Sequence, residues 1–154
     1  KENGDFFTTY MGRQPVIITR DKKGEIHGFI NACTHRGAQL VNTAGGNKRS
    51  LTCPFHMWSF NLDGTLMDCG EHKGNVGYSD SFSKDDLGLQ KIGNIESYRG
   101  FVFGVLDDNA CTLAEYLRDA KQMIDLLVDQ SDEGLEILPG ATTYTYDGNW
   151  KLQA

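Results

Sequence analysis

Hydrophobic and polar residues alternate in short runs over the first two-thirds of the chain, and glycine or aspartate residues separate the runs. Residues 16–19 and 26–30 are two such runs, joined by a charged turn that ends in Gly24. Alternation with a period of two, interrupted by a turn of this composition, is typical of a β-hairpin. The sequence therefore predicts a hairpin within residues 13–31.

Two further pairs of strands are predicted along the chain. One pair flanks the dipeptide Asp63-Gly64, which supplies the positive φ angles that a two-residue turn requires. The other pair is interrupted by glycines and follows a polar connection. The predicted strands are residues 58–62, 65–67, 92–98 and 101–106, and the polar connection is residues 74–86. The first two-thirds of the chain is thus expected to be mostly β.

The pattern changes at Thr112, where a capping-box sequence is followed by apolar residues at helical spacing. One amphipathic helix is expected from there to about Gln130. Residues 142–152 alternate like a strand, and the chain stops at Ala154 without a turn. We therefore expect a mostly β, antiparallel domain followed by one helix and a cut-off strand, within a longer polypeptide.

Composition narrows the range of functions. The apolar fraction of 39% is ordinary for a globular protein. Fifteen Lys and Arg against 21 Asp and Glu give a net charge of −6, which argues against a nucleic-acid partner. No apolar stretch approaches the roughly 20 residues that cross a bilayer, so no membrane partner is expected. The lack of a signal-like segment favours the cytoplasm.

Four residues carry the chemistry. Cys33 and His35 form a C-x-H pair, and Cys53 and His56 form a C-x-x-H pair later in the chain. In a Rieske [2Fe-2S] centre two cysteines hold one iron and two histidines hold the other, and each of two loops supplies one ligand of each type. The spacing matches this division, so these four residues are the predicted cluster ligands.

Two alternatives remain open from the residues alone. A four-ligand zinc site would use the same residue types, although zinc-finger sequences usually pair like with like. Cys69 and His72 form another C-x-x-H pair, but they lack the aromatic neighbours that follow His56. The roles of Cys69, His72 and Cys111 are left unassigned, and His27 is expected to be structural.

With these ligands in place, the chain resembles a Rieske [2Fe-2S] protein. It resembles most closely the amino-terminal part of the large (α) subunit of aromatic-ring-hydroxylating dioxygenases, in the benzoate and anthranilate dioxygenase branch. One departure is Met57, where the family usually has glycine. The segments that carry the resemblance are residues 33–37, 53–56 with Trp58 and Phe60, 98–104, 128–131 and 146–151.

The resemblance implies a domain organisation and a set of neighbours for the cluster. Residues 1–110 would form the Rieske domain, with a cluster-binding subdomain of two loops. Residues 111–154 would lead into a catalytic domain absent from this chain. The residues expected around the cluster are Arg36, Gly37, Trp58 and Phe60.

The resemblance also implies a function. The chain would pass electrons from an NADH-dependent reductase to a mononuclear Fe(II) site that only the full-length protein holds, and no catalytic residue is expected in this chain. Neighbouring α subunits and a β subunit would be partners of the full-length protein. The alternatives are a stand-alone Rieske ferredoxin and a zinc-binding interaction module. Substrate, oligomeric state and reductase are not identified by the sequence.

Overall fold

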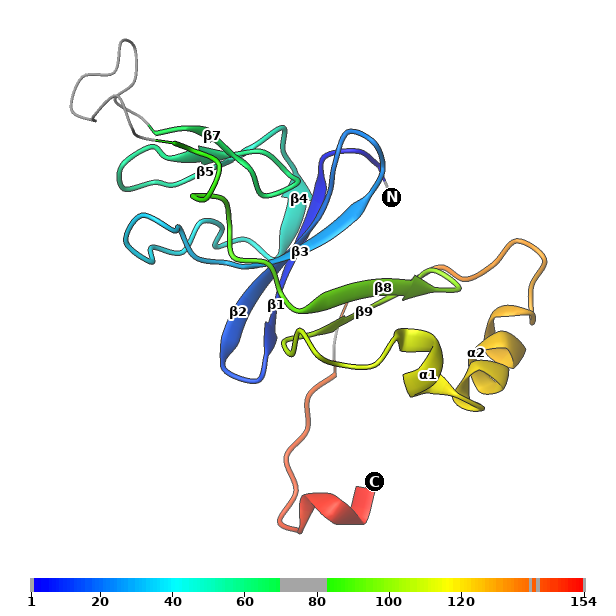
Figure 1. Ribbon diagram of the computed structural model, residues 1–154. Helices are drawn as coiled ribbons and strands as arrows, with labels where there is room; N and C mark the ends of the chain where they lie inside the picture. Colours follow the sequence, from blue (N-terminus) through cyan, green and yellow to red (C-terminus); the bar gives the residue numbers. More distant parts are fainter. Residues whose placement is uncertain (1, 70–82, 139, 141, 154) are drawn as a thin grey trace. The chain divides into compact units, whose positions relative to one another are not determined.

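The computed structural model describes residues 2–69, 83–138, 140 and 142–153 (Figure 1). These residues fall into two compact units, Lys1–Arg118 and Asp119–Ala154. The regular structure of the first unit consists of antiparallel strands, apart from one short helix near its end, and the unit contains all four predicted ligands. His72 and most of the polar connection predicted for residues 74–86 lie outside the described residues.

The first sheet has the strand order β3-β2-β1-β4, with all neighbouring strands antiparallel. The predicted hairpin is confirmed as the β2–β3 pair, in which Val16 lies opposite Ile30. Along β1 the side chains alternate, so that Phe6 enters the core while Phe7 is exposed. The sheet strands are β1 (Asp5–Met11), β2 (Gln14–Arg20), β3 (Ile26–Ile30) and β4 (Gly45–Asn47).

The second sheet is smaller and has the order β5-β6-β7, with β5 (Leu51–Thr52), β6 (Ser59–Phe60) and β7 (Leu66–Asp68). The hairpin predicted around Asp63-Gly64 is confirmed as β6–β7. Gly64 has a φ of 86°, and a Cβ at this position would lie 2.3 Å from the Phe29 ring. This turn can therefore close onto the core only with glycine.

The third sheet is the two-stranded hairpin of β8 (Asn94–Tyr98) and β9 (Phe101–Val105), which confirms the last predicted strand pair. Its two-residue turn places Arg99 at φ 51° and Gly100 at φ 88°. Two positive φ angles at the centre of a hairpin turn match the right-handed twist of the flanking strands.

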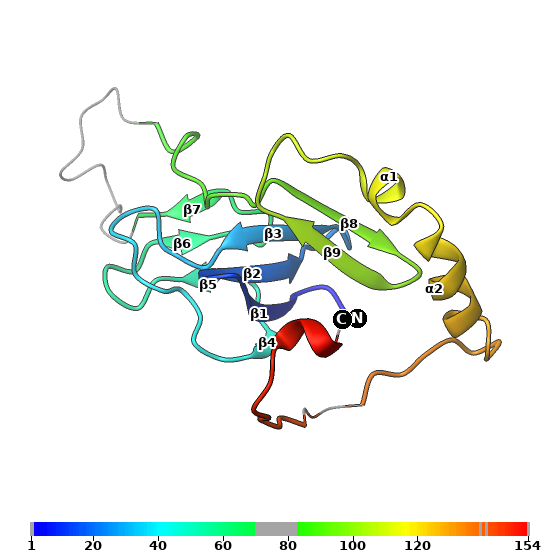
Figure 2. The same ribbon diagram turned by 90° about the horizontal axis from the view of Figure 1, so that it is seen from below.

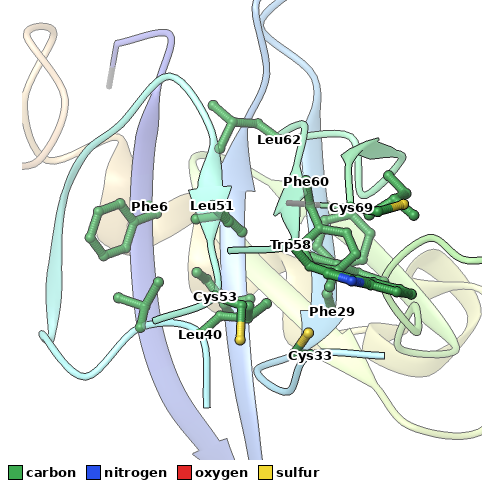
Figure 3. Close-up of a cluster of buried hydrophobic side chains, with 14 residues drawn as sticks. Phe6, Phe29, Cys33, Leu40, Leu51, Cys53, Trp58, Phe60, Leu62 and Cys69 are labelled. Carbon is green, nitrogen blue, oxygen red and sulfur yellow. The ribbon is translucent and has the colours of Figure 1, made fainter. Parts of the chain in front are cut away.

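One apolar core lies between the first two sheets and reaches the start of both cysteine-containing loops (Figure 3). Its buried side chains include Phe29, Leu51 and Phe60, none of which is exposed to solvent. Cys33 and Cys53 belong to the same cluster, and Figure 3 shows their sulfur atoms at the same end of it. Packing in the core thus fixes the positions of both thiols.

The helical part departs from the sequence prediction. The capping box at Thr112 is confirmed, but the single expected helix is two, α1 (Leu113–Leu117) and α2 (Ala120–Val128). The break comes at Arg118, whose φ of 43° cannot continue a right-handed helix. The expected strand at residues 142–152 is also wrong, because residues 142–149 hold no strand and η1 (Trp150–Gln153) is a 3-10 helix.

The described helices are few and short. None of them is long and apolar enough to cross a membrane.

Candidate metal centre

Two loops at the same end of the first unit carry the predicted ligands (Figure 2). The first loop follows β3 and contains Cys33 and His35, and the second connects β5 to β6 and contains Cys53 and His56. The four side chains line one hollow of about 370 Å³. The structure therefore brings all four predicted ligands together from two separate segments of the chain.

The two loops repeat one backbone conformation. In the first, the N–H of Cys33 donates to the carbonyl oxygen of Ala38 at 2.8 Å, and the chain turns through Gly37 at φ 73°. In the second, the N–H of Cys53 donates to the carbonyl oxygen of Trp58 at 2.7 Å, and the chain turns through Met57 at φ 60°. Met57 therefore adopts the left-handed backbone conformation, although the family usually has glycine at this position.

Side-chain hydrogen bonds close each loop at its base. The buried amide of Asn31 donates to the carbonyl oxygen of Val41 at 2.8 Å and accepts from the Val41 N–H at 3.1 Å. In the second loop the hydroxyl groups of Thr52 and Ser59 lie 3.0 Å apart and share a hydrogen bond. These bonds fix where each loop leaves and rejoins the sheets, and so fix the ligands between them.

The four donors lie at different depths. Cys33 and Cys53 are buried, with 2% and 1% of their surfaces exposed, whereas His35 is half-buried and His56 is exposed. The two imidazole rings meet edge to face, with their centroids 4.8 Å apart. The two sulfur donors therefore lie inside the core, and the two imidazoles lie nearer the surface.

The local electrostatics of the first loop disfavour the charged forms of its two donors, the Cys33 thiolate and the protonated His35 imidazole. Burial raises the pKa of the Cys33 thiol, and the nearby Cys53 thiol raises it further, against the opposing effect of the His35 and Arg36 backbone N–H groups. Burial also lowers the pKa of His35, and the charges of Arg36 and His56 act in the same direction. A neutral imidazole is the form that ligates a metal, whereas the thiols must release protons to do so.

One atom of this site lacks a hydrogen-bond partner. His35 Nδ1 is buried, and among the described residues it is the single buried side-chain nitrogen or oxygen without a partner. Buried polar atoms are nearly always satisfied, so an exception points to a missing ligand. Two sulfur and two nitrogen donors form the donor set of a Rieske cluster, and these residues fit that group.

Of the four residues expected around the cluster, two line the hollow and two lie in the core together with the cysteines. Arg36 and Gly37 line the hollow itself. The indole of Trp58 stacks on the His35 ring, with centroids 4.8 Å apart and planes 10° from parallel. Phe60 is fully buried and packs against Trp58 at a centroid distance of 6.5 Å.

The remaining cysteines lie elsewhere. Cys69 is buried in the apolar core, where burial raises the pKa of its thiol, and Cys111 is exposed. Neither residue lines the hollow between the two loops. Because His72 lies outside the described residues, the alternative pair of Cys69 and His72 cannot be placed as a unit.

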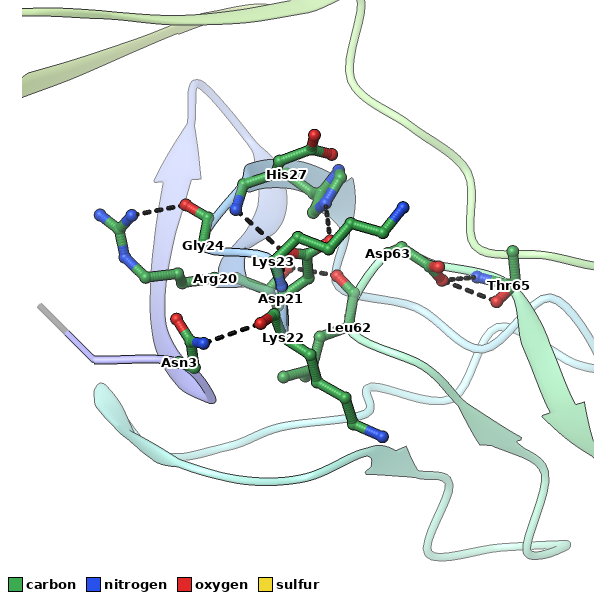
Figure 4. A network of polar contacts seen from close by, with 12 residues as sticks. Asn3, Arg20, Asp21, Lys22, Lys23, Gly24, His27, Leu62, Asp63 and Thr65 are labelled. Atoms are coloured by element: carbon green, nitrogen blue, oxygen red, sulfur yellow. Dashed lines mark hydrogen bonds and ion pairs between the residues drawn. The ribbon is translucent and has the colours of Figure 1, made fainter.

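A second group of metal-binding residue types occurs in the turn between β2 and β3 (Figure 4). Ligand atoms of Asp21, Glu25 and His27 lie within 4.8 Å of one another. The Asp21 carboxylate, however, already accepts hydrogen bonds from the N–H groups of Lys23 and Glu25, and His27 Nε2 lies 3.1 Å from it. These hydrogen bonds stabilise the turn, so the three side chains have a structural explanation, in agreement with the role expected for His27.

Comparison with known proteins agrees with this geometry. Residues 1–82, more than half of the chain, match the family model of the Rieske [2Fe-2S] domain. This chain belongs to the Rieske [2Fe-2S] domain family. A Rieske domain binds a [2Fe-2S] cluster, which decides against the zinc-binding interaction module.

The relatives of this Rieske domain confirm the resemblance to dioxygenase large subunits. Toluate 1,2-dioxygenase subunit alpha of Pseudomonas putida is 50% identical, over 99% of this chain and 34% of its own length. The anthranilate 1,2-dioxygenase large subunit of Acinetobacter baylyi is 51% identical, over 98% of this chain and 32% of its own length. The chain thus spans about a third of the curated relatives it matches, and the match extends well past residue 82.

Solved structures give the same result. The crystal structure of naphthalene 1,2-dioxygenase from Rhodococcus sp. bound to indole superposes with a TM-score of 0.88 at 37% identity. The superposition covers 99% of this chain and 34% of the other. The Rieske fold predicted from the motifs is therefore confirmed.

Sequence reasoning missed the residues that hold the loops. Asn31 and the pair of Thr52 and Ser59 were not singled out, nor was Thr34, whose hydroxyl donates to the carbonyl oxygen of Leu87 at 2.9 Å. Each acts through a partner distant in the sequence or across a strand pair, and such partners leave no short motif. Only the position of Asn31, a polar residue at the end of an apolar strand, could have drawn attention.

Proposed function

We propose that Cys33 and Cys53 hold one iron of a [2Fe-2S] cluster and that His35 and His56 hold the other. The observation that carries this assignment is the convergence of these four donors on one hollow, with His35 Nδ1 buried and unbonded. Such a cluster accepts and releases one electron when bound. The chain contributes the two buried thiols, the two imidazoles and a core that keeps water from the sulfur side.

On this basis the chain is the electron-transfer part of the terminal oxygenase of an aromatic-ring dioxygenase. An NADH-dependent reductase would supply electrons, and the full-length protein would pass them to a mononuclear non-heme iron. Identities of 50% and 51% to a toluate and an anthranilate dioxygenase subunit support an aromatic carboxylate as substrate. The full-length protein would assemble with further α subunits and with a β subunit.

Oxygen activation would belong to the part of the full-length protein that this chain lacks. Apart from the proposed ligands the sequence contains only His27 and His72, too few independent histidines for a site of two histidines and one carboxylate. His27 is already engaged with Asp21. This chain alone would therefore carry electrons and hydroxylate nothing.

The domain organisation follows from the same proposal. Residues 1–110 would be the Rieske domain, and residues 111–154 would lead into the catalytic domain of the full-length protein. Four cysteines without disulfides suit a reducing compartment, and we place the protein in the cytoplasm on that ground.

Reconstitution of the purified chain with iron and sulfide tests the ligand assignment. We expect a brown protein with equal amounts of iron and sulfide and an EPR signal on reduction. Cys53→Ser and His56→Ala should each abolish the assembled cluster, whereas the control Cys111→Ser, at an exposed position outside the hollow, should load like the parent. Full loading of Cys53→Ser, or a colourless protein that binds one zinc ion, would overturn the assignment.

A further inference from the structure

The two histidines of the hollow are held in different ways. His35 lies between two rings, with the indole of Trp58 stacked on its face and the edge-to-face imidazole of His56 beside it. His56 is exposed, and its other ring neighbour, Phe55, is tilted at 41° and is itself 72% exposed. The His35 imidazole is therefore held between two rings, whereas the His56 imidazole is exposed at the edge of the hollow.

The stack of Trp58 on His35 connects the two loops. Trp58 is the last residue of the second loop, yet the ring it stacks on belongs to the first loop. Through its own carbonyl oxygen, Trp58 also accepts the hydrogen bond from the N–H of Cys53 at 2.7 Å. One residue thus fixes the backbone around a thiol of one loop and the imidazole plane of the other.

Trp58 is itself packed into the core. Only 6% of its surface is exposed, and Phe60, which is fully buried, packs against it from the core side. A ring held in this way can impose its plane on a neighbour. By contrast, rotation about the bond between Cβ and the ring of a histidine is otherwise broad and weakly restrained.

We propose that Trp58 is a positioning residue that sets the plane of His35 and keeps its Nδ1 turned into the hollow before iron arrives. The inference rests on the proposed function and deepens it, because it concerns how one ligand is presented. The buried, unbonded Nδ1 is the atom that the stack holds in place. Residues that orient metal ligands commonly change metal affinity by about 10–100-fold when they are lost.

The first test uses the iron-free protein and needs no substitution of Trp58. A stacked indole shields protons of the ring beneath it, so NMR should show the His35 ring protons shifted upfield of those of His56. The variants His35→Gln and His56→Gln assign the signals. Unshifted His35 protons in the folded iron-free chain would overturn the proposal.

The second test compares substitutions in the loaded protein. Trp58→Phe keeps a planar ring, and Trp58→Met keeps apolar volume without a plane. Phe6→Leu is the control, because Phe6 is buried in the same core but lies away from Trp58 (Figure 3). We expect Trp58→Met to lose iron to a chelator about tenfold faster than Phe6→Leu. We also expect it to broaden the histidine-nitrogen couplings in the ENDOR spectrum of the reduced sample, and we expect Trp58→Phe to restore most of the parent behaviour.

The outcomes separate this inference from the proposed function. Equal iron loss and unchanged nitrogen couplings in Trp58→Met and Phe6→Leu would show that Trp58 only fills the core, and would overturn the positioning role. Failure of the parent chain to form any cluster would instead overturn the proposed function. If Trp58→Met does not fold, the proposal stays falsifiable, because unshifted His35 ring protons in the parent chain would still overturn it.

Discussion

Met57 has a backbone conformation that its side chain disfavours. It adopts a φ of 60° beside a proposed ligand, at the position where the first loop has Gly37. A non-glycine residue in the left-handed region costs about 1–2 kcal/mol. Glycine in its place would cost about 0.4–1 kcal/mol in added freedom of the unfolded chain. Since the Met57 side chain is 57% exposed and packs little, the backbone strain outweighs the entropy.

Met57→Gly should therefore stabilise the chain. We expect the free energy of unfolding in urea to rise by about 0.5–1 kcal/mol, the difference between the two costs. The matched control is Gly37→Ala, which places a side chain at φ 73° in the other loop, in open space, and should lower the free energy of unfolding. A lower stability for Met57→Gly would mean that the exposed methionine makes contacts worth more than the strain.

Asn31 makes a second residue-scale prediction. Its side chain is 1% exposed and satisfies both polar groups of the Val41 backbone. Asn31→Ala should lower the free energy of unfolding by about 1–3 kcal/mol, because the buried Val41 N–H loses its partner while the Val41 carbonyl oxygen keeps the hydrogen bond from Gln39. Gln39→Ala is the control, since Gln39 donates to the same carbonyl oxygen at 3.1 Å from an exposed position. Its effect should stay within about 0.5 kcal/mol, and equal losses in the two variants would refute the role of burial.

At the scale of elements, the sequence predicted those strands that are joined by local turns. The hairpins β2–β3, β6–β7 and β8–β9 each have a glycine-containing turn between apolar runs. By contrast, β4 and β5 are short and are defined mainly by partners elsewhere in the chain. Period and turn chemistry report local structure, so strands of this second kind leave little signal.

The two errors of element prediction have the same origin. The apolar spacing after Thr112 fits one helix, but it contains no signal for the break at Arg118. The alternation of residues 142–152 suits a strand, yet the described residues provide no partner strand for it. A strand is stable only when its backbone groups are paired, and alternation alone does not supply the pairing.

The turn between β2 and β3 should make stability depend on pH. Burial would raise the pKa of Asp21, but hydrogen bonds from His27 and from the Glu25 and Lys23 N–H groups outweigh it and hold the pKa below its ordinary value. A depressed folded-state pKa stabilises the protein above the unfolded value of about 3.9, and the stabilisation is lost as the pH falls through the folded value. The carboxylate form of Asp21 should therefore stabilise this turn at neutral pH.

Asp21→Asn should accordingly lower the urea midpoint at pH 7, and the difference from the parent should shrink below about pH 4. Asp86→Asn, which removes the same charge from an exposed position, is the control and should leave the midpoint nearly unchanged. The measurement is urea unfolding followed by circular dichroism across this pH range. A difference that persists undiminished at low pH would show that Asp21 acts through something other than its charge.

At the scale of the whole molecule, the site was more predictable than the fold around it. Two thiols and two imidazoles at this spacing are recognisable as metal ligands from the sequence alone. The sequence therefore indicated four of the residues that line the hollow. The sequence did not reveal the stacking on His35 or the bonds at the base of the loops. These depend on contacts between segments far apart in the chain, which only the packed structure specifies.

The last prediction concerns what iron adds to a domain that already has a core. Cys33 and Cys53 belong to a large buried cluster, so the chain without iron should stay folded, with the loops as its least protected part. Binding to the native state alone raises stability by mass action. Loading should therefore raise the urea midpoint and slow hydrogen exchange at the amides of Gly37 and Met57, which bond within the ligand loops.

Amides of Ile17 and Ile18 in β2 are the internal reference, because they pair with neighbouring strands. Removing iron with a chelator should restore fast exchange in the loops well before it affects β2. If both groups of amides instead lost protection together, the cluster rather than the apolar core would hold the fold.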